Sequence, residues 1–225
     1  MTTLLPVAGF GLSHHTAPLG LRERFAFGPH ARQQWYEHVR DTWPGEEPPE
    51  ILLLSTCNRT ECLFASREDL AEVRGSLAER LRAAAGVTRE ELAPALVVHA
   101  GLDTVRHLGL VAAGADSMIF GESEILGQLR AALDHARAAG AAGPVLSALV
   151  EHALKAGRRV RRETAIGRCS ASVASEALRA VAERVDLASA RAVLLGAGDV
   201  ARTAGLLLAR RTASLEVVAR SASEI

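Results

Sequence analysis

The sequence is poor in cysteine and aromatic residues, has no net charge and contains no long apolar run, and each shortage argues against a class of protein. Three cysteines at irregular spacing among 225 residues disfavour a disulfide framework and suit a reducing compartment. The 26 basic residues are matched by 26 acidic ones, so contact with nucleic acid would need a local patch. No run approaches the roughly 18 apolar residues of a membrane-spanning helix, and the N-terminus lacks the features of a signal peptide. A cytoplasmic protein with no membrane association is therefore expected.

What the sequence does contain is the pattern of a globular protein, with 48% apolar and 23% charged residues. Short apolar runs and helically spaced apolar residues alternate through the first hundred residues. Their order is strand, helix, strand, strand, helix, strand, which predicts a ferredoxin-like βαββαβ domain. The predicted strands cover residues 4–12, 51–54, 61–65 and 95–99, and the predicted helices cover residues 29–43 and 70–86.

From about residue 101 the pattern becomes helical, with candidate helices starting near residues 102, 125, 145 and 173. A strand at 191–195, a glycine turn, a helix at 202–211 and a strand at 215–219 then predict the start of a Rossmann-type unit. Two strands and one helix cannot cover both faces of a parallel sheet. The predicted fold class is therefore α/β (α+β), with one domain at residues 1–165. A linker helix and an incomplete nucleotide-binding domain follow at 166–225.

The glycine turn has the pattern Gly196-x-Gly198-x-x-Ala201 between a predicted strand and a predicted helix, which favours a pyrophosphate at the helix N-terminus. The acidic residue that would bind a ribose 2′-hydroxyl about 20 positions later is absent. Arg220 follows the second strand instead, and an arginine suits a 2′-phosphate, so NADPH is favoured over NADH. The predicted cofactor-binding residues are Gly196, Ala197, Gly198, Asp199, Val200, Ala201 and Arg220.

Cys57 lies in the short connection between two predicted strands, where a rigid scaffold can present a reactive side chain. A thiol attacks as the thiolate, and positive charge or hydrogen-bond donors nearby lower its pKa. Arg59, two residues further on, is expected to have this effect. The alternative is a small buried residue, which is the usual role of a free cysteine.

Four segments resemble the glutamyl-tRNA reductase family in order and spacing. Residues 55–61, STCNRTE, resemble its nucleophile motif, and residues 11–18, GLSHHTAP, with residues 22–24, RER, resemble its N-terminal signature. Residues 114–128, GADSMIFGESEILGQ, resemble its second substrate-binding motif, and residues 155–167, KAGRRVRRETAIG, resemble its basic segment before the nucleotide domain. The first domain is accordingly interpreted as catalytic, binding glutamate charged on its tRNA.

The resemblance implies an NADPH-dependent reduction that opens tetrapyrrole synthesis. Cys57 would attack the ester carbonyl of glutamyl-tRNA to give a thioester, and a hydride would reduce this to glutamate-1-semialdehyde for an aminotransferase. Arg59 suits a bidentate grip on a substrate carboxylate, and Glu122 or Glu124 could hold the α-ammonium. Many members carry Gln where this chain has Glu124 and Leu where it has Ala115. The residues that match the glutamate pocket are Thr56, Asn58, Arg59, Ser117, Glu122, Ser123, Glu124 and Gln128.

Histidines supply the candidates for proton transfer. His107 lies ten residues before Ser117, the spacing of a histidine that the family places near the cysteine, so it is preferred over its rival His99. The doublet His14 and His15 has no partners at metal-ligand spacing, which favours a solvated or substrate-facing turn over a metal site.

A basic run before the glycine turn is the candidate contact with tRNA. Lys155, Arg158, Arg159 and Arg162 share one helical stripe, which could bind several phosphates. A solvated helix face is the alternative.

The family's long helix and C-terminal dimerisation region have no counterpart in these 225 residues. The family forms homodimers through that missing region. We therefore expect the isolated chain to have poor reductase activity. Two other classes stay open. One is a truncated, non-reducing fragment that binds tRNA or a partner, and the other is a cysteine-dependent aldehyde dehydrogenase with the same thioester chemistry.

Overall fold

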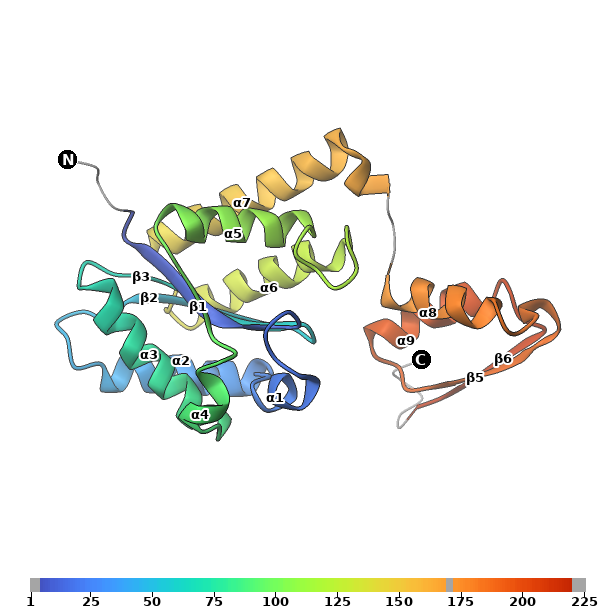
Figure 1. The fold of residues 1–225 in the computed structure, drawn as a ribbon, viewed down its shortest axis with the longest axis horizontal. Coiled ribbons are helices and arrows are strands. Elements are labelled where there is room, and N and C mark those ends of the chain that lie inside the picture. The colour runs from blue at the N-terminus through green and yellow to red at the C-terminus, as the bar shows by residue number, and fades with distance from the viewer. Residues whose placement is uncertain (1–4, 169–171, 220–225) are drawn as a thin grey trace. The chain divides into compact units, whose positions relative to one another are not determined.

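The computed structural model describes residues 5–168 and 172–219 and divides into two compact units, Met1–Cys169 and Ser170–Ile225 (Figure 1). Among these described residues each unit has its own sheet, with four strands in the first and two in the second. The predicted domain boundary between residues 165 and 166 falls inside a short 3-10 helix, η1 (Ala165–Arg168). Within the two described stretches, no helix has both the length and the hydropathy needed to cross a membrane.

The sheet of the first unit has the strand order β2-β3-β1-β4, and neighbouring strands are antiparallel. Its strands are β1 (Val7–Ser13), β2 (Glu50–Ser55), β3 (Arg59–Ala65) and β4 (Val97–Ala100). All four predicted strands are present, each within three residues of its predicted ends. Side chains alternate between the two faces of a strand, so Arg59 and Glu61 of β3 share one face, and Thr60 and Cys62 share the other.

Helices cover both faces of this sheet, with α2 and α3 on one side and α5, α6 and α7 on the other (Figure 1). Their bounds are α2 (Pro29–Thr42), α3 (Leu70–Ala85), α5 (Leu102–Ala113), α6 (Glu124–Ala138) and α7 (Pro144–Glu163). Leu52, Leu53 and Phe64 are fully buried between these layers. Each of these helices lies where apolar spacing predicts one, because a stripe of apolar residues is what such a layer must bury.

Two short helices, α1 (Leu19–Arg24) and α4 (Arg89–Leu92), were not expected. Helices of four to six residues are too short to show a 3.6-residue period, so the sequence pattern does not reveal them. α1 begins six residues after the end of β1 and contributes to the site described below.

The second unit contains α8 (Val173–Ala182), the 3-10 helix η2 (Leu187–Ser189), β5 (Arg191–Leu195), α9 (Asp199–Leu208) and β6 (Ser214–Val218). β5 and β6 are parallel, with α9 as the connection between them. The predicted strands are present, whereas α9 begins three residues before the predicted helix start. In the described part of this unit one face of the pair is open, since Val193 and Leu195 are 59% and 77% exposed, whereas α9 packs on the face that carries Leu194.

Candidate active site

Cys57 occupies a tight turn between β2 and β3, and it is exposed. The hydroxyl oxygen of Thr56 accepts from the backbone N–H groups of Asn58 and Arg59 at 3.1 and 3.2 Å. The carbonyl of Asn58 accepts from the N–H of His14 at 2.8 Å, which ties the turn to the end of β1. Thr56 and Asn58, both predicted as pocket residues, therefore shape the turn that presents the thiol.

The surroundings of Cys57 correct one expectation. Burial raises the pKa of its thiol, and the nearby carboxylates of Glu122 and Glu124 raise it further. The cysteine's own N–H and the charge of Arg22 act in the opposite direction but do not balance these effects, so the pKa of Cys57 lies above its ordinary value. The expectation of a lowered thiol pKa is therefore wrong, and Arg59 is not among the main influences on this thiol, because its guanidinium binds Glu61 and Asp116.

Arg59 is 2% exposed and lies between two carboxylates. Its Nη1 donates to Glu61 Oε1 at 2.7 Å, and its Nη2 donates to Asp116 Oδ2 at 2.9 Å and to the Asp116 carbonyl oxygen. A buried charge requires such partners, because desolvation without them is costly. The guanidinium is therefore already occupied by protein groups, and a substrate carboxylate would have to share it with Asp116, the more exposed of its two partners.

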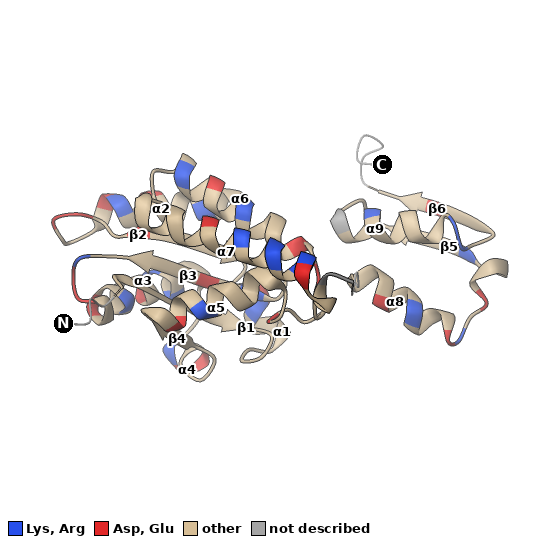
Figure 2. Ribbon diagram, turned by 90° about the horizontal axis from the view of Figure 1, so that it is seen from above, with Lys and Arg blue, Asp and Glu red and all other residues tan. Residues whose placement is uncertain are grey.

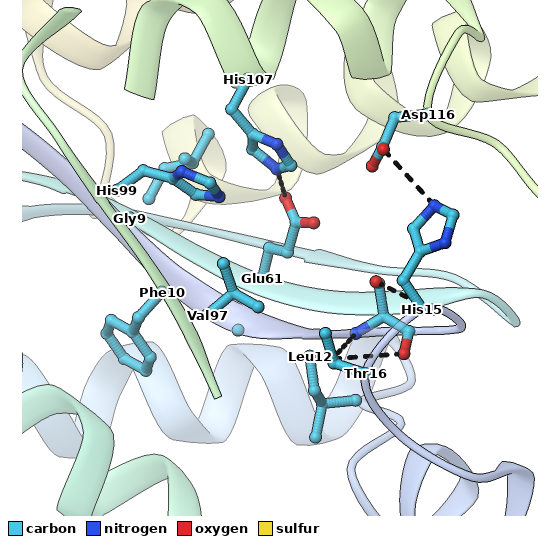
Figure 3. Close-up of a pocket in the computed structure, with 13 residues that line it drawn as sticks. Gly9, Phe10, Leu12, His15, Thr16, Glu61, Val97, His99, His107 and Asp116 are labelled. Atoms are coloured by element: carbon cyan, nitrogen blue, oxygen red, sulfur yellow. Dashed lines mark hydrogen bonds and ion pairs between the residues drawn. The ribbon is translucent and has the colours of Figure 1, made fainter. Parts of the chain in front are cut away.

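His107 and His99 lie together on the same side of the sheet (Figure 3). Their rings stack with centroids 4.2 Å apart and 14° between planes. The Nε2 of His107 is 2.9 Å from Glu61 Oε2. Because Glu61 also binds Arg59, the three side chains form one connected cluster, Arg59–Glu61–His107. Burial raises the pKa of Glu61, but the hydrogen bond to His107 and the charge of Arg59 outweigh it, so this pKa lies below its ordinary value. Glu61 is thus a carboxylate acceptor and Nε2 of His107 its donor.

A pocket of about 170 Å³ opens beside these histidines, lined by Glu61, His99, His107, His15 and Asp116 among others (Figure 3). Two glycines of β1 make room for it. A Cβ atom on Gly11 would lie 2.6 Å from the Glu61 Cα, and a Cβ on Gly9 would lie 2.9 Å from the Leu63 side chain. The Nε2 of His15 lies 3.5 Å from Asp116 Oδ1, and both residues line the pocket.

The segment after α5 closes the site from the other side. Asp116 binds Arg59, as described, while Glu122 is 8% exposed and Ser117 is half-buried. Ser123 and Glu124 are exposed at the start of α6, and Gln128 is half-buried one turn later. The structure thus brings the two predicted pocket segments together, through Arg59 and Asp116. Asp116, Arg22 and Arg161 were not singled out from the sequence as site residues.

Arg161 in α7 explains how the Glu122 segment is held. Its Nη1 donates to the carbonyl oxygens of Gly121 and Glu122 at 2.6 and 3.0 Å. Gly121 has a φ of 79°, a left-handed conformation that favours glycine. In the sequence, Arg161 differs from its basic neighbours in one respect. It does not share the helical stripe of Lys155, Arg158, Arg159 and Arg162, and it therefore points to another side of α7.

Figure 2 colours basic residues blue along α7. The four residues of the predicted stripe on this helix are exposed: Lys155, Arg158, Arg159 and Arg162. Arg159 and Arg162 pair with Glu163 at 2.8 and 3.0 Å. Such exposed pairs contribute little to stability, so these side chains are available to a charged partner.

The second unit contains the predicted nucleotide turn. Gly196 has a φ of 105°, and Gly198 is the N-cap residue of α9. A cavity of about 400 Å³ is lined by Gly196, Ala197 and Ala201, together with apolar residues of both strands. The side chain of Asp199 and all of Arg220 lie outside the described part of the chain, and Val200 is exposed.

Comparisons with known proteins agree with the residue-level resemblance. Residues 10–164 match the family model described as the N-terminal domain of glutamyl-tRNA(Glu) reductase. The glutamyl-tRNA reductase of Thermomicrobium roseum is 41% identical over 203 residues, 90% of this chain and 48% of the relative. That of Rubrobacter xylanophilus is 41% identical over 197 residues, 86% and 44% of the two chains. The solved glutamyl-tRNA reductase from Methanopyrus kandleri superposes with a TM-score of 0.61 at 27% identity, covering 97% of this chain and 50% of that one.

Proposed function

This chain belongs to the glutamyl-tRNA reductase family, and we propose that it performs the acyl-transfer step of that reaction through Cys57. The chain spans about half the length of the curated relatives it matches. One observation carries the proposal: an exposed thiol on a turn that is continuous with the buried Arg59–Glu61–His107 cluster. In the full reaction the product is glutamate-1-semialdehyde, which enters tetrapyrrole synthesis.

The chemistry follows from the residues around the turn. The Cys57 thiolate attacks the ester carbonyl carbon of glutamyl-tRNA, a C–S bond forms, and the C–O bond to the terminal ribose breaks. The Cys57 thiol gives its proton to His107 as the thiolate forms, and His107 returns this proton to the departing ribose oxygen. Because the Glu61 carboxylate accepts from the Nε2–H of His107, the Nδ1 atom is the one that takes up and releases this proton.

The glutamyl group is proposed to be recognised by charges already in the site. Glu122, buried beside the thiol, suits the α-ammonium better than the exposed Glu124. Arg59, shared with Asp116, suits the side-chain carboxylate. Ser117, Ser123 and Gln128 supply neutral donors and acceptors along the same segment.

The glycine turn of the second unit fits NADPH. Gly196 and Gly198 let a pyrophosphate approach the backbone, and α9 offers its N-terminal N–H groups. A Cβ on either glycine would meet nothing within 4 Å, so the space above the turn is open. NADPH, when bound, supplies the hydride that converts an acyl thioester into an aldehyde.

The fold assignments support the same conclusion. The β2-β3-β1-β4 order, with antiparallel neighbours, supports a ferredoxin-like arrangement of the first unit. The β5-α9-β6 unit, with its parallel pair, supports a Rossmann-type arrangement of the second.

The test is deacylation of glutamyl-tRNA by the purified chain, with and without NADPH. We expect Cys57→Ser to slow tRNA release by about a thousandfold or more, because the nucleophile is lost. Cys62→Ala is the matched control, since this thiol is fully buried on the face of β3 opposite to Arg59 and Glu61. Release by Cys57→Ser at the wild-type rate would refute the proposal.

A second candidate, a fragment that binds charged tRNA without reducing it, is favoured by the open face of β5 and β6. Wild-type protein that releases tRNA but forms no semialdehyde with NADPH would support it. For tRNA binding itself, the double charge reversal Arg158→Glu and Arg162→Glu should weaken affinity and reduce its salt dependence. Arg106→Glu, an exposed arginine on α5, is the control.

A further inference from the structure

Arg22, in the short helix α1, contacts the turn that carries Cys57. Its Nη1 donates to the Cys57 carbonyl oxygen at 2.7 Å, and its Nε donates to the Ala17 carbonyl oxygen at 3.3 Å. Both bonds come from one planar fork, so the guanidinium is fixed in orientation as well as in position. The segment after β1 is thereby fastened to the turn between β2 and β3, 35 residues further along the chain.

We propose that Arg22 is a positioning residue for Cys57, which holds the backbone of the nucleophile and places an uncompensated positive charge beside its thiolate. This inference rests on the proposed function, in which Cys57 is the nucleophile. Both acceptors of Arg22 are neutral carbonyl oxygens, and no carboxylate within residues 5–168 forms an ion pair with it. Arg59, in contrast, is neutralised by Glu61 and Asp116.

The charges around the thiol give Arg22 its importance. A thiolate at Cys57 is opposed by partial burial and by Glu122 and Glu124, and among the groups that favour it are Arg22 and the cysteine's own N–H. If Arg22 loses its charge, the opposing carboxylates remain. The fraction of Cys57 present as thiolate at neutral pH then falls, and the rate of any attack by that thiol falls with it.

Arg24 provides a matched control within the same helix. It is two residues away, and its guanidinium binds Glu91 at 2.6 Å and the Gly86 carbonyl oxygen at 2.6 Å, away from the cysteine turn. Replacing Arg24 therefore removes the same charge and the same side chain from α1 without removing a contact with Cys57.

The experiment measures the rate of Cys57 alkylation by iodoacetamide as a function of pH, read by mass spectrometry of the peptide that carries this residue. We expect Arg22→Gln to be alkylated about threefold to tenfold more slowly at pH 7, with the midpoint of the pH profile moved upward. Arg22→Glu should be slower still, and Arg22→Lys should be nearest to wild type. Arg24→Gln should match wild type.

The order of the variants separates the charge from a purely structural role. A structural role predicts that the alkylation rate follows the thermal midpoint of each variant, whereas the proposal predicts that it follows the charge at position 22. Wild-type pH profiles for Arg22→Gln and Arg22→Glu would overturn the proposal. If Arg22→Gln does not fold, Arg22→Lys decides, because a loss as large as tenfold with the charge retained contradicts the role of charge.

Alkylation needs neither tRNA nor NADPH. The Arg22 proposal can therefore fail while Cys57→Ser still abolishes tRNA release, and the proposed function can fail while Arg22 still governs the thiol.

Discussion

The two sheets of this chain differ in how they are covered. The antiparallel sheet of the first unit has helices on both faces, and Leu53 and Phe64 are fully buried in it. The parallel pair β5 and β6 leaves one face open, with Leu195 77% exposed. This difference matters for buried charges. The helix layers of the first unit exclude water from the sheet, which strengthens the interaction between Arg59 and Glu61 and keeps their side chains in a fixed arrangement. The second unit carries its candidate site on an open turn instead.

The chain offers a convenient way to observe the two units separately. Trp35, Trp43 and Tyr36 are all its tryptophan and tyrosine residues, and all lie in the first unit. Intrinsic fluorescence therefore follows unfolding of the first unit alone. Hydrogen exchange measured by mass spectrometry follows peptides of the second unit.

The largest expected effect is on the buried charge cluster. Arg59→Ala should lower the free energy of unfolding of the first unit by about 3–5 kcal/mol, because the buried carboxylate of Glu61 loses the positive charge that it pairs with. Arg191→Ala, at the exposed start of β5, should change stability by no more than about 0.5 kcal/mol. Urea unfolding followed by fluorescence, together with hydrogen exchange, measures both. A cost below about 1 kcal/mol for Arg59→Ala would mean that the cluster is not held as described.

The next effect compares one leucine in each sheet. Leu53→Ala should cost about 2–5 kcal/mol, since it empties a fully buried position in β2. Leu195→Ala, on the open face of β5, should cost no more than about 0.5 kcal/mol. Urea midpoints for the first unit and exchange rates for the second are the measurements. Similar costs at the two positions would contradict the contrast between covered and open faces.

A smaller effect tests the space made by glycine. Gly11→Ala should cost about 1–3 kcal/mol, because its Cβ would meet the backbone of Thr60 and Glu61 on the paired strand. Gly205→Ala in α9 is the counterpart: its Cβ would meet the Leu194 side chain at 3.4 Å, an ordinary contact, and alanine favours helix by up to about 1 kcal/mol. Thermal unfolding by fluorescence and exchange in α9 should show opposite signs for the two variants.

The smallest effect is confined to acid and concerns Glu61. Burial raises its pKa, but the His107 hydrogen bond and the Arg59 charge lower it more, so the folded state has the lower pKa. The stabilisation is therefore complete above the ordinary carboxyl pKa of about 4.3 and is lost as the pH falls through the lower folded value. Urea midpoints from fluorescence between pH 7 and pH 2.5 should show this decline, and Glu61→Gln should make it shallower.

Much of the fold follows from local pattern. The four strands of the first sheet and its long helices stand where alternation and helical spacing indicate them, because each element must bury one face. The motif at residues 55–61 also identifies the turn that exposes Cys57. These features depend on residues that are neighbours in sequence.

The direction of Arg59 and the contacts of Arg22 and Arg161 could not be predicted in this way. Arg59 meets Asp116 57 residues later, and Arg22 meets Cys57 35 residues later. A basic residue has similar helical or strand patterns whether it faces solvent or a carbonyl oxygen. The partner is chosen by the packing of distant elements, which no local pattern records.

Under the proposed function, the exposure of Cys57 would place the acyl thioester in competition with water. An acyl group carried on this exposed thiol would be within reach of bulk solvent, and its hydrolysis would return free glutamate without any reduction. The ratio of aldehyde to glutamate among the products would then report how fast the donor arrives relative to water. This ratio, rather than the rate of acylation, would set the fraction of charged tRNA that is consumed without forming aldehyde.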